Sequence, residues 1–377
     1  MKNNKNGSVH KAIAAILISA TLILAVGIVV NGWALEPEEE NSSDIGANTD
    51  NADKLYGDTD KNDGTADNFT ENEETEEVPK APDHFNYLTG LGIESNLAAI
   101  QPKVFCIDPN APLYSVDGSE VIIEFPTESN GSRMLVFRTD TAALGKIGAF
   151  APSRDYMGAL VKLFGGLLVA NGNDDIVNYN SIAQTLNADL SKYKNNIYRE
   201  NGNSVYTDSK LLDDIFKSEN IDTEAYKTNK TPFNFCEYGD EIKNKTVAKE
   251  IFIPYDDESK TTLTFDEELG EYKLLKGEHA RIDMLTGNQL AFKNVFVLFA
   301  DMTTYERSYG TENVVETTTK GTGYYFTCGT LCEIRWNVNS SNELIFETLS
   351  GEVLTVNRGT SYISYYKSSA SADVVFY

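Results

Sequence analysis

The residues best placed to do chemistry are Arg154, Asp155 and Tyr156, which follow a glycine-containing strand pattern and open a predicted helix. Free backbone N–H groups at a helix N-terminus, the helix dipole and an arginine all favour an anion there. Asp155 partly neutralises that attraction, so we expect a ligand-binding role of modest affinity and no catalytic role. The alternative is an exposed first-turn ion pair, whose removal costs less than about 1 kcal/mol.

Motifs of known enzyme classes are missing from the sequence. The three histidines have no His-x-x-x-His spacing, and there is no Gly-x-Ser-x-Gly elbow, phosphate loop or dinucleotide fingerprint. The segment from Asp58 to Glu71 resembles a calcium loop, but Gly64 falls one position too late when counted from Asp58. We therefore predict no catalytic residue, no metal and no cofactor. The alternative is a hydrolase that uses carboxylates. The sequence contains too many acidic residues to identify which two would form its catalytic pair.

The N-terminal region is typical of a membrane anchor. Lys2, Lys5 and Lys11 precede an uncharged apolar run within residues 12–33. About 19 residues of helix at 1.5 Å each cover roughly 28 Å, enough to cross a bilayer. The lysines lie on one side only, which predicts a cytoplasmic tip at residues 1–11 and a single-pass protein with an extracytoplasmic body. Cleavage of the run as a signal peptide, followed by secretion, is the alternative.

An acidic linker follows at residues 34–84. Acids far outnumber lysines there and large apolar residues are scarce, so we expect this segment to be disordered and extended. The whole chain has a formal charge of −25, which argues against binding to nucleic acid. The predicted contact with the membrane is through the helix alone.

Two folded regions are predicted after the linker, at residues 85–245 and 246–377. The first combines short apolar strands with helices after Ser153 and from Asp208 to Ile221, which indicates an α/β-like domain. The second has many short strands separated by glycines, which indicates a β-rich antiparallel domain. The predicted fold class is α+β behind an N-terminal transmembrane helix.

Cysteines also fit an extracytoplasmic address. Cys328 and Cys332 lie between two predicted strands, and a hairpin with a three-residue loop would let them face each other. We therefore predict a disulfide between them, which an oxidising compartment permits. Cys106 and Cys236 are interpreted as small buried residues.

Several motifs resemble the YerB-like family of bacterial envelope lipoproteins. They are Asn86-Tyr87-Leu88-Thr89-Gly90-Leu91, Ile147 to Tyr156, Gly270-x-Tyr272, Asp283-x-x-Thr286-Gly287 followed by Asn294-Val295, the Trp336 strand and Gly359-Thr360-Ser361-Tyr362-Ile363. The resemblance spans roughly residues 85–370 as two consecutive domains. Ala151 stands where the family motif has an arginine, the segment Asn203 to Tyr206 lacks the family's histidine, and no lipid-anchor cysteine follows the apolar run.

The resemblance implies an envelope address more than a reaction, because the function of the family is unknown. We predict a membrane-tethered extracytoplasmic protein that binds a cell-wall polymer or an envelope protein. A sensor that signals through the anchor is disfavoured, because the cytoplasmic tip is short and carries no recognisable motif.

Overall fold

The computed structural model describes the chain from residue 80 to its end, apart from short internal segments. The described ranges are 80–127, 131–142, 144–172, 186–193, 198–200, 204–223, 231–255, 260–307 and 310–377. The predicted tip, the predicted anchor, the calcium-like segment and the predicted linker up to residue 79 lie outside them. Within these ranges no helix is both long and apolar enough to cross a bilayer.

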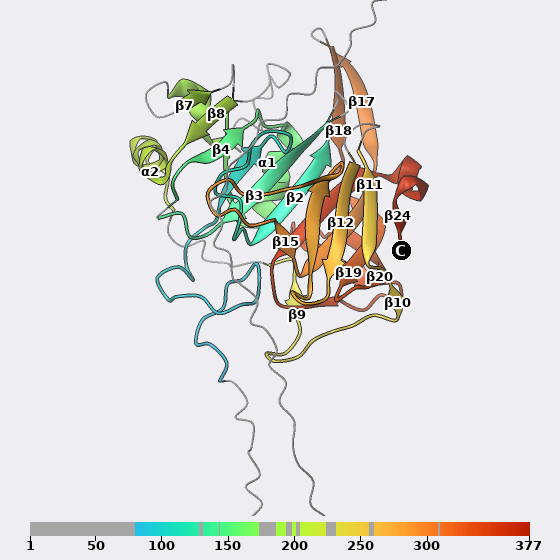
Figure 1. Ribbon diagram of the computed structural model, residues 1–377. Coiled ribbons are helices and arrows are strands. Elements are labelled where there is room, and N and C mark those ends of the chain that lie inside the picture. The colour runs from blue at the N-terminus through green and yellow to red at the C-terminus, as the bar shows by residue number, and fades with distance from the viewer. Residues whose placement is uncertain are drawn as a thin grey trace, which may run out of the picture. The chain divides into compact units, whose positions relative to one another are not determined.

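Most strands belong to one large sheet of 14 strands (Figure 1). Its path runs β10-β20-β19-β16-β23-β2-β3-β1-β4-β8-β7, with β21 beside β20, β5 beside β1, and β6 beside β5. These strands are β1 (Lys103–Ile107), β2 (Val121–Pro126), β3 (Ser132–Arg138), β4 (Ile147–Phe150), β5 (Leu167–Ala170), β6 (Leu186–Asp189), β7 (Tyr198–Glu200), β8 (Ser204–Thr207), β10 (Thr246–Val247), β16 (Asn294–Ala300), β19 (Lys320–Thr327), β20 (Thr330–Val338), β21 (Leu344–Thr348) and β23 (Ser361–Lys367).

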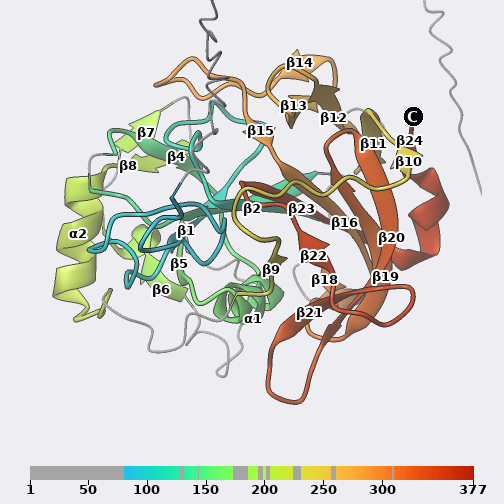
Figure 2. The ribbon, with the colours of Figure 1, turned by 90° about the horizontal axis from the view of Figure 1, so that it is seen from below.

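A second sheet of six strands packs against the C-terminal half of the large sheet, as both views show (Figures 1 and 2). Its strands are β11 (Glu250–Pro254), β12 (Lys260–Asp266), β13 (Glu271–Lys276), β14 (His279–Ala280), β15 (Ala291–Phe292) and β24 (Val375–Phe376). The remaining elements are the pair β9 (Asn234–Phe235) and β22 (Thr355–Val356), the hairpin β17 (Met302–Arg307) and β18 (Gly310–Val315), the helices α1 (Asp155–Leu163) and α2 (Ser209–Ser218), and the 3₁₀ turns Leu190–Lys192 and Ser368–Asp373.

Strand β16 is buried on both faces, which explains its uninterrupted apolar sequence. Val295 and Val297 pack with the six-stranded sheet in one core, and Phe296 and Leu298 pack in a second core on the opposite face. Helix α1 belongs to the second core and α2 to the first, so the two helices lie on opposite faces of the large sheet.

Both predicted helices are present in the structure. Asp208 caps α2, because its side chain accepts a hydrogen bond from Leu211 N at 2.8 Å. Helix α1 ends at Leu163, and Gly165 just beyond its cap has a positive φ of 68°, which suits a residue without a Cβ. Its cap is Arg154, one residue later than the Ser153 expected from the sequence.

Parallel pairing joins the two halves of the described chain. Strand β23 pairs in parallel with β16 on one side and with β2 on the other, so strands from both sides of residue 245 share one sheet. Residues 75–377 cluster as a single unit. The described part is β-rich with mostly antiparallel pairs and two α-helices, which confirms the β-rich character of the predicted α+β fold.

A buried carboxylate links the two sheets. Glu124 on β2, 1% exposed, forms an ion pair of 2.7 Å with Lys276 on β13. Ser132 on β3 and Tyr362 on β23 also donate hydrogen bonds to this carboxylate. Burial alone would raise the pKa of Glu124, but the charge of Lys276 and the hydrogen bonds from Lys276, Ser132 and Tyr362 together lower it.

Replacing Lys276 with methionine should destabilise the fold strongly. The change leaves the Glu124 carboxylate buried without its countercharge, so we expect a loss of about 3–5 kcal/mol in the free energy of unfolding. Urea unfolding of the full-length chain measures this loss. Adding Glu124→Gln should restore part of it, because the amide is neutral and still accepts hydrogen bonds.

The control is the exposed pair Lys249–Glu267, whose side chains are 53% and 71% exposed. Lys249→Met should cost less than about 1 kcal/mol. Equal losses of unfolding free energy for Lys276→Met and Lys249→Met would show that the buried ion pair contributes no more to stability than the exposed one.

Candidate functional site

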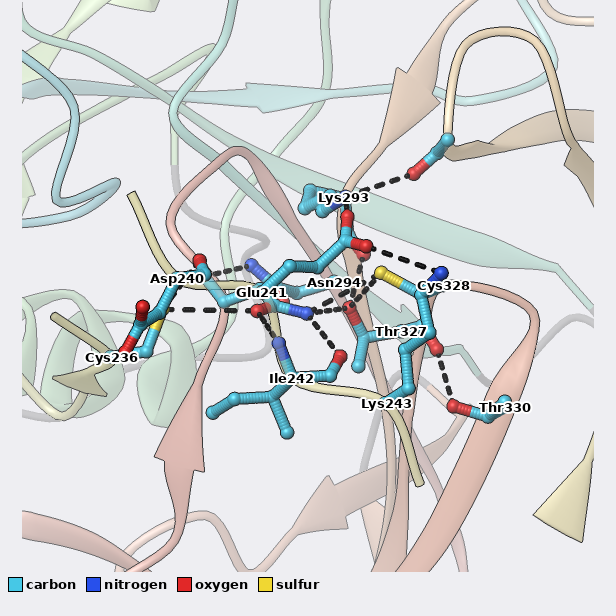
Figure 3. Close-up of polar contacts among 12 residues, drawn as sticks. Cys236, Asp240, Glu241, Ile242, Lys243, Lys293, Asn294, Thr327, Cys328 and Thr330 are labelled. Carbon is cyan, nitrogen blue, oxygen red and sulfur yellow. Dashed lines mark hydrogen bonds and ion pairs between the residues drawn. The ribbon is translucent and has the colours of Figure 1, made fainter. Parts of the chain in front are cut away.

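A polar cluster on an open surface lies between the loop at residues 236–243 and the turn that joins β19 to β20 (Figure 3). The loop follows β9, and the turn consists of Cys328 and Gly329, both with positive φ. Lys293, which immediately precedes β16, and Asn357, which immediately follows β22, complete the cluster.

Asn357 fixes the position of the loop. Its buried side chain donates hydrogen bonds to Ile242 O and Thr327 Oγ1, each at 2.8 Å, and accepts one from Ile242 N at 2.7 Å. Its carbonyl accepts a hydrogen bond from Asn294 Nδ2 at 2.9 Å. The side chain and the backbone carbonyl of this one residue therefore connect the loop, the hairpin and the start of β16, and this restricts the residues around it.

Glu241 is the charged centre of the cluster. Lys293 Nζ lies 2.6 Å from one carboxylate oxygen and Lys243 Nζ lies 3.4 Å from the other. The hydrogen bond from Lys293, followed by one from the Cys328 thiol, lowers the pKa of Glu241 to about 2. Burial, followed by the hydrogen bond to Glu241, raises the pKa of Cys328. The thiol therefore stays protonated at neutral pH and is a poor nucleophile.

Arg358 is held rigidly beside this cluster. Its Nε donates to Cys236 O at 2.9 Å and its Nη1 to Gly90 O at 2.5 Å. The rings of Phe85, Phe235 and Tyr238 surround its guanidinium at 4.7, 5.9 and 6.0 Å. Cation–π contacts of this kind hold a guanidinium in one orientation without neutralising its charge.

An open hollow of about 320 Å³ lies over these residues. It is lined by Leu91, Tyr238, Gly239, Asp240, Glu241, Lys293, Asn357 and Arg358. A second hollow of about 540 Å³ shares Asp240 and Glu241 and extends toward Cys236 and Thr355. Charged, amide and aromatic groups therefore converge on one small concave surface, which is typical of a binding site for a polar ligand.

The residues that the sequence favoured are placed elsewhere. Arg154, 6% exposed, and Tyr156, 7% exposed, lie at the start of α1, and Tyr156 packs edge-on against Phe125. Neither they nor Asp155 line the hollow. The expectation of an exposed ion pair at Arg154 is wrong, because the Ala151–Ser153 segment pairs with the end of β5: Asn171 N donates to Ala151 O, and Ser153 N donates to Gly172 O.

The predicted disulfide is absent. Cys328 and Cys332 are both free thiols, because Thr327 pairs with Thr330 and the hairpin loop has two residues instead of three. Cys332 then faces Tyr325 across the hairpin. The interpretation of Cys106 and Cys236 as small buried residues is confirmed.

The site residues that sequence reasoning missed stand next to its motifs. Lys293 precedes Asn294-Val295, and Asn357 and Arg358 precede Gly359. Polar residues beside such motifs could have been chosen as candidate site residues from the sequence. The loop that carries Asp240 and Glu241 has no pattern that distinguishes it from other acidic turns.

The described part is thus a β-rich fold with an open polar hollow, and comparisons with known proteins agree with this fold. Residues 251–363 match the C-terminal domain of DUF3048, a protein family of unknown function. The chain is similar to the crystal structure of the YerB protein from Bacillus subtilis, with a TM-score of 0.67 and 16% sequence identity over 80% of this chain and 100% of that one. At this identity the likeness shows a shared fold alone. No curated protein matches the chain.

The domain match and the shared fold together confirm the resemblance to the YerB-like family that the motifs predicted. Neither comparison supplies a function.

Arg154→Ala should destabilise the protein by more than about 1 kcal/mol, because the substitution empties a buried position instead of removing a surface charge. Arg335→Ala is the matched control, since Arg335 is exposed on β20 and should change stability by less than about 0.5 kcal/mol. Urea unfolding of both variants decides the matter. Similar small losses would restore the sequence-based expectation.

The contribution of Glu241 to stability should depend on pH. Its folded-state pKa of about 2 lies below the ordinary value of 4.5, so its stabilisation is complete above pH 4.5 and is lost as the pH falls toward 2. The melting temperature of the wild type should exceed that of Glu241→Gln near neutral pH, and the gap should close over this window. The gap is small, because the side chain is 46% exposed and solvent screens the pair.

Glu333→Gln, which alters an exposed glutamate on β20, is the control and should follow the wild type throughout. A gap between wild type and Glu241→Gln that stays constant from pH 7 to pH 2 would contradict the assignment of this ion pair.

Proposed function

We propose that the chain is a membrane-tethered, extracytoplasmic binding protein of the bacterial envelope, and that it holds a polar ligand in the hollow beside Arg358. The ligand is a group on a cell-wall polymer or on an envelope protein. The observation that carries the proposal is the convergence of Tyr238, Asp240, Glu241 and Arg358 on one open surface.

The side chains at this surface suit recognition. Tyr238, 38% exposed, offers an aromatic face that can stack on a sugar ring or a peptide group. The ion pair of Glu241 with Lys293 and the hydrogen bonds of Asn357 hold the surface in one conformation. Such preorganisation reduces the entropy lost when a ligand binds.

The address rests on the sequence. The basic tip at residues 1–11 and the apolar run at residues 12–33 support a single-pass anchor with the folded part outside. The acidic linker would hold that part away from the membrane, since self-repulsion extends the chain.

Hydrolysis is the second candidate, and one observation favours it. Glu271 and Glu241 both interact with Lys293, and their pKa values move in opposite directions: burial raises that of Glu271, and Lys293 lowers that of Glu241. Carboxyl groups with separated pKa values can serve as acid and base. Glu271 does not line the hollow, however, so the geometry supports binding better than hydrolysis.

Binding to purified cell walls tests the proposed function. Full-length protein in detergent should sediment with the walls, and Tyr238→Ala should reduce the bound fraction about tenfold, because stacked aromatic residues carry much of the energy of such contacts. Tyr305→Ala is the matched control, since Tyr305 is 39% exposed on the β17–β18 hairpin. Equal retention of both variants would remove the hollow from the binding surface.

The proposed orientation in the membrane is tested by a separate experiment on cells. Protease added to cells with an opened wall should remove the folded part from the full-length chain. Protection until the membrane is permeabilised would overturn the proposed orientation.

A further inference from the structure

The hollow beside Arg358 is lined by two opposite charges that have no ion-pair partner among the described residues. Arg358 and Asp240 both line it, and neither forms an ion pair with another residue in the described part of the chain. The other charges there are already matched, because Glu241 is paired with Lys293 and Lys243 (Figure 3). One positive group and one negative group therefore remain available to a ligand.

Arg358 is the better defined of the two groups. A guanidinium has five N–H donors, and its two hydrogen bonds to Cys236 O and Gly90 O leave three donors without a partner among the described residues. The ring of Phe85 at 4.7 Å and those of Phe235 and Tyr238 keep the guanidinium from turning away. A fixed guanidinium fork matches the geometry of a carboxylate.

Asp240 supplies the opposite charge. It lies in the turn that begins at Glu237, where Asp240 N donates to Glu237 O, and its side chain is exposed. An ammonium group near this carboxylate would be attracted, while a second anion would be repelled. A purely anionic ligand thus suits Arg358 and is disfavoured by Asp240.

We infer that the hollow binds a zwitterion: a carboxylate against Arg358 and an ammonium group toward Asp240, as on an amino acid or a short peptide. The inference rests on the proposed function and names the chemistry of its ligand. Leu91 and Tyr238 on the wall of the hollow provide apolar surface for a small side chain. A volume of about 320 Å³ suits a ligand of this size.

Four dipeptide probes separate the two charges. They are alanyl-alanine, N-acetyl-alanyl-alanine, alanyl-alanine amide and N-acetyl-alanyl-alanine amide, which carry both charges, the carboxylate alone, the ammonium alone and neither. Calorimetric titration of the full-length protein should rank the zwitterion tightest, with a loss of about tenfold when either charge is removed.

Two variants assign each charge to its residue. Arg358→Met should weaken the two probes that carry a carboxylate and leave alanyl-alanine amide unchanged. Asp240→Asn should weaken the two probes that carry an ammonium group and leave N-acetyl-alanyl-alanine unchanged. Arg335→Met, which removes an exposed arginine from β20, should change none of the four affinities.

Arg358 also holds the loop at Gly90, so Arg358→Met can fail to fold. The ranking of the four probes on the wild type and the result for Asp240→Asn then decide the inference. Equal binding of all four probes overturns it. If the wild type binds cell walls but none of the dipeptides, the inference is overturned and the proposed function stands. If the wild type does not bind cell walls, the proposed function and the inference that rests on it both fail.

Discussion

The ion pair between Glu124 and Lys276 is the constraint on which the rest of the structure depends. Two charges withdrawn from water are stable only if they meet with good geometry, so β2 of the large sheet and β13 of the second sheet have one allowed alignment. Tyr362 donates to the same carboxylate, and this adds β23 to that alignment. Apolar packing alone would tolerate a slip of one sheet over the other, whereas a slip here leaves a buried charge without its partner.

The candidate site follows from this alignment. Strands β16 and β23 are parallel, and Asn294 lies opposite Ser361, so the residues just before each strand reach the same edge. Lys293 comes immediately before β16, and Asn357 and Arg358 come from the segment before β23. The close approach is strict, because a Cβ on Gly359 would lie 2.5 Å from the Lys293 side chain. A shift of one residue would move Arg358 away from its three rings and separate Lys293 from Glu241.

Local patterns predicted much of the fold and little of the site. The short apolar runs became strands, and the periodic residues after Asp208 became a helix, because both signals arise from neighbours in sequence. The sharing of one sheet by both halves depends on parallel pairing between β2 and β23, which no local pattern encodes. Arg154 is buried, and the segment just before it pairs with the residues that follow β5, a contact between distant parts of the chain. The predicted cysteine pair fails by one residue of loop length. The motif that begins at Gly359 lies next to the candidate site, but it gave no reason to choose Arg358 as a binding residue.

The electrostatics of the site explain why it suits binding. Catalysis by Cys328 would need a thiolate, and the pKa of this thiol is raised by burial and by its hydrogen bond to Glu241. Glu241 in turn is a weak base, because Lys293 lowers its pKa to about 2. The ion pair and hydrogen bonds among Glu241, Lys293 and Cys328 hold these side chains in place beneath the hollow. Asp240 and Arg358, which form no ion pair within the described part of the chain, line the hollow, so their charges can interact with a ligand.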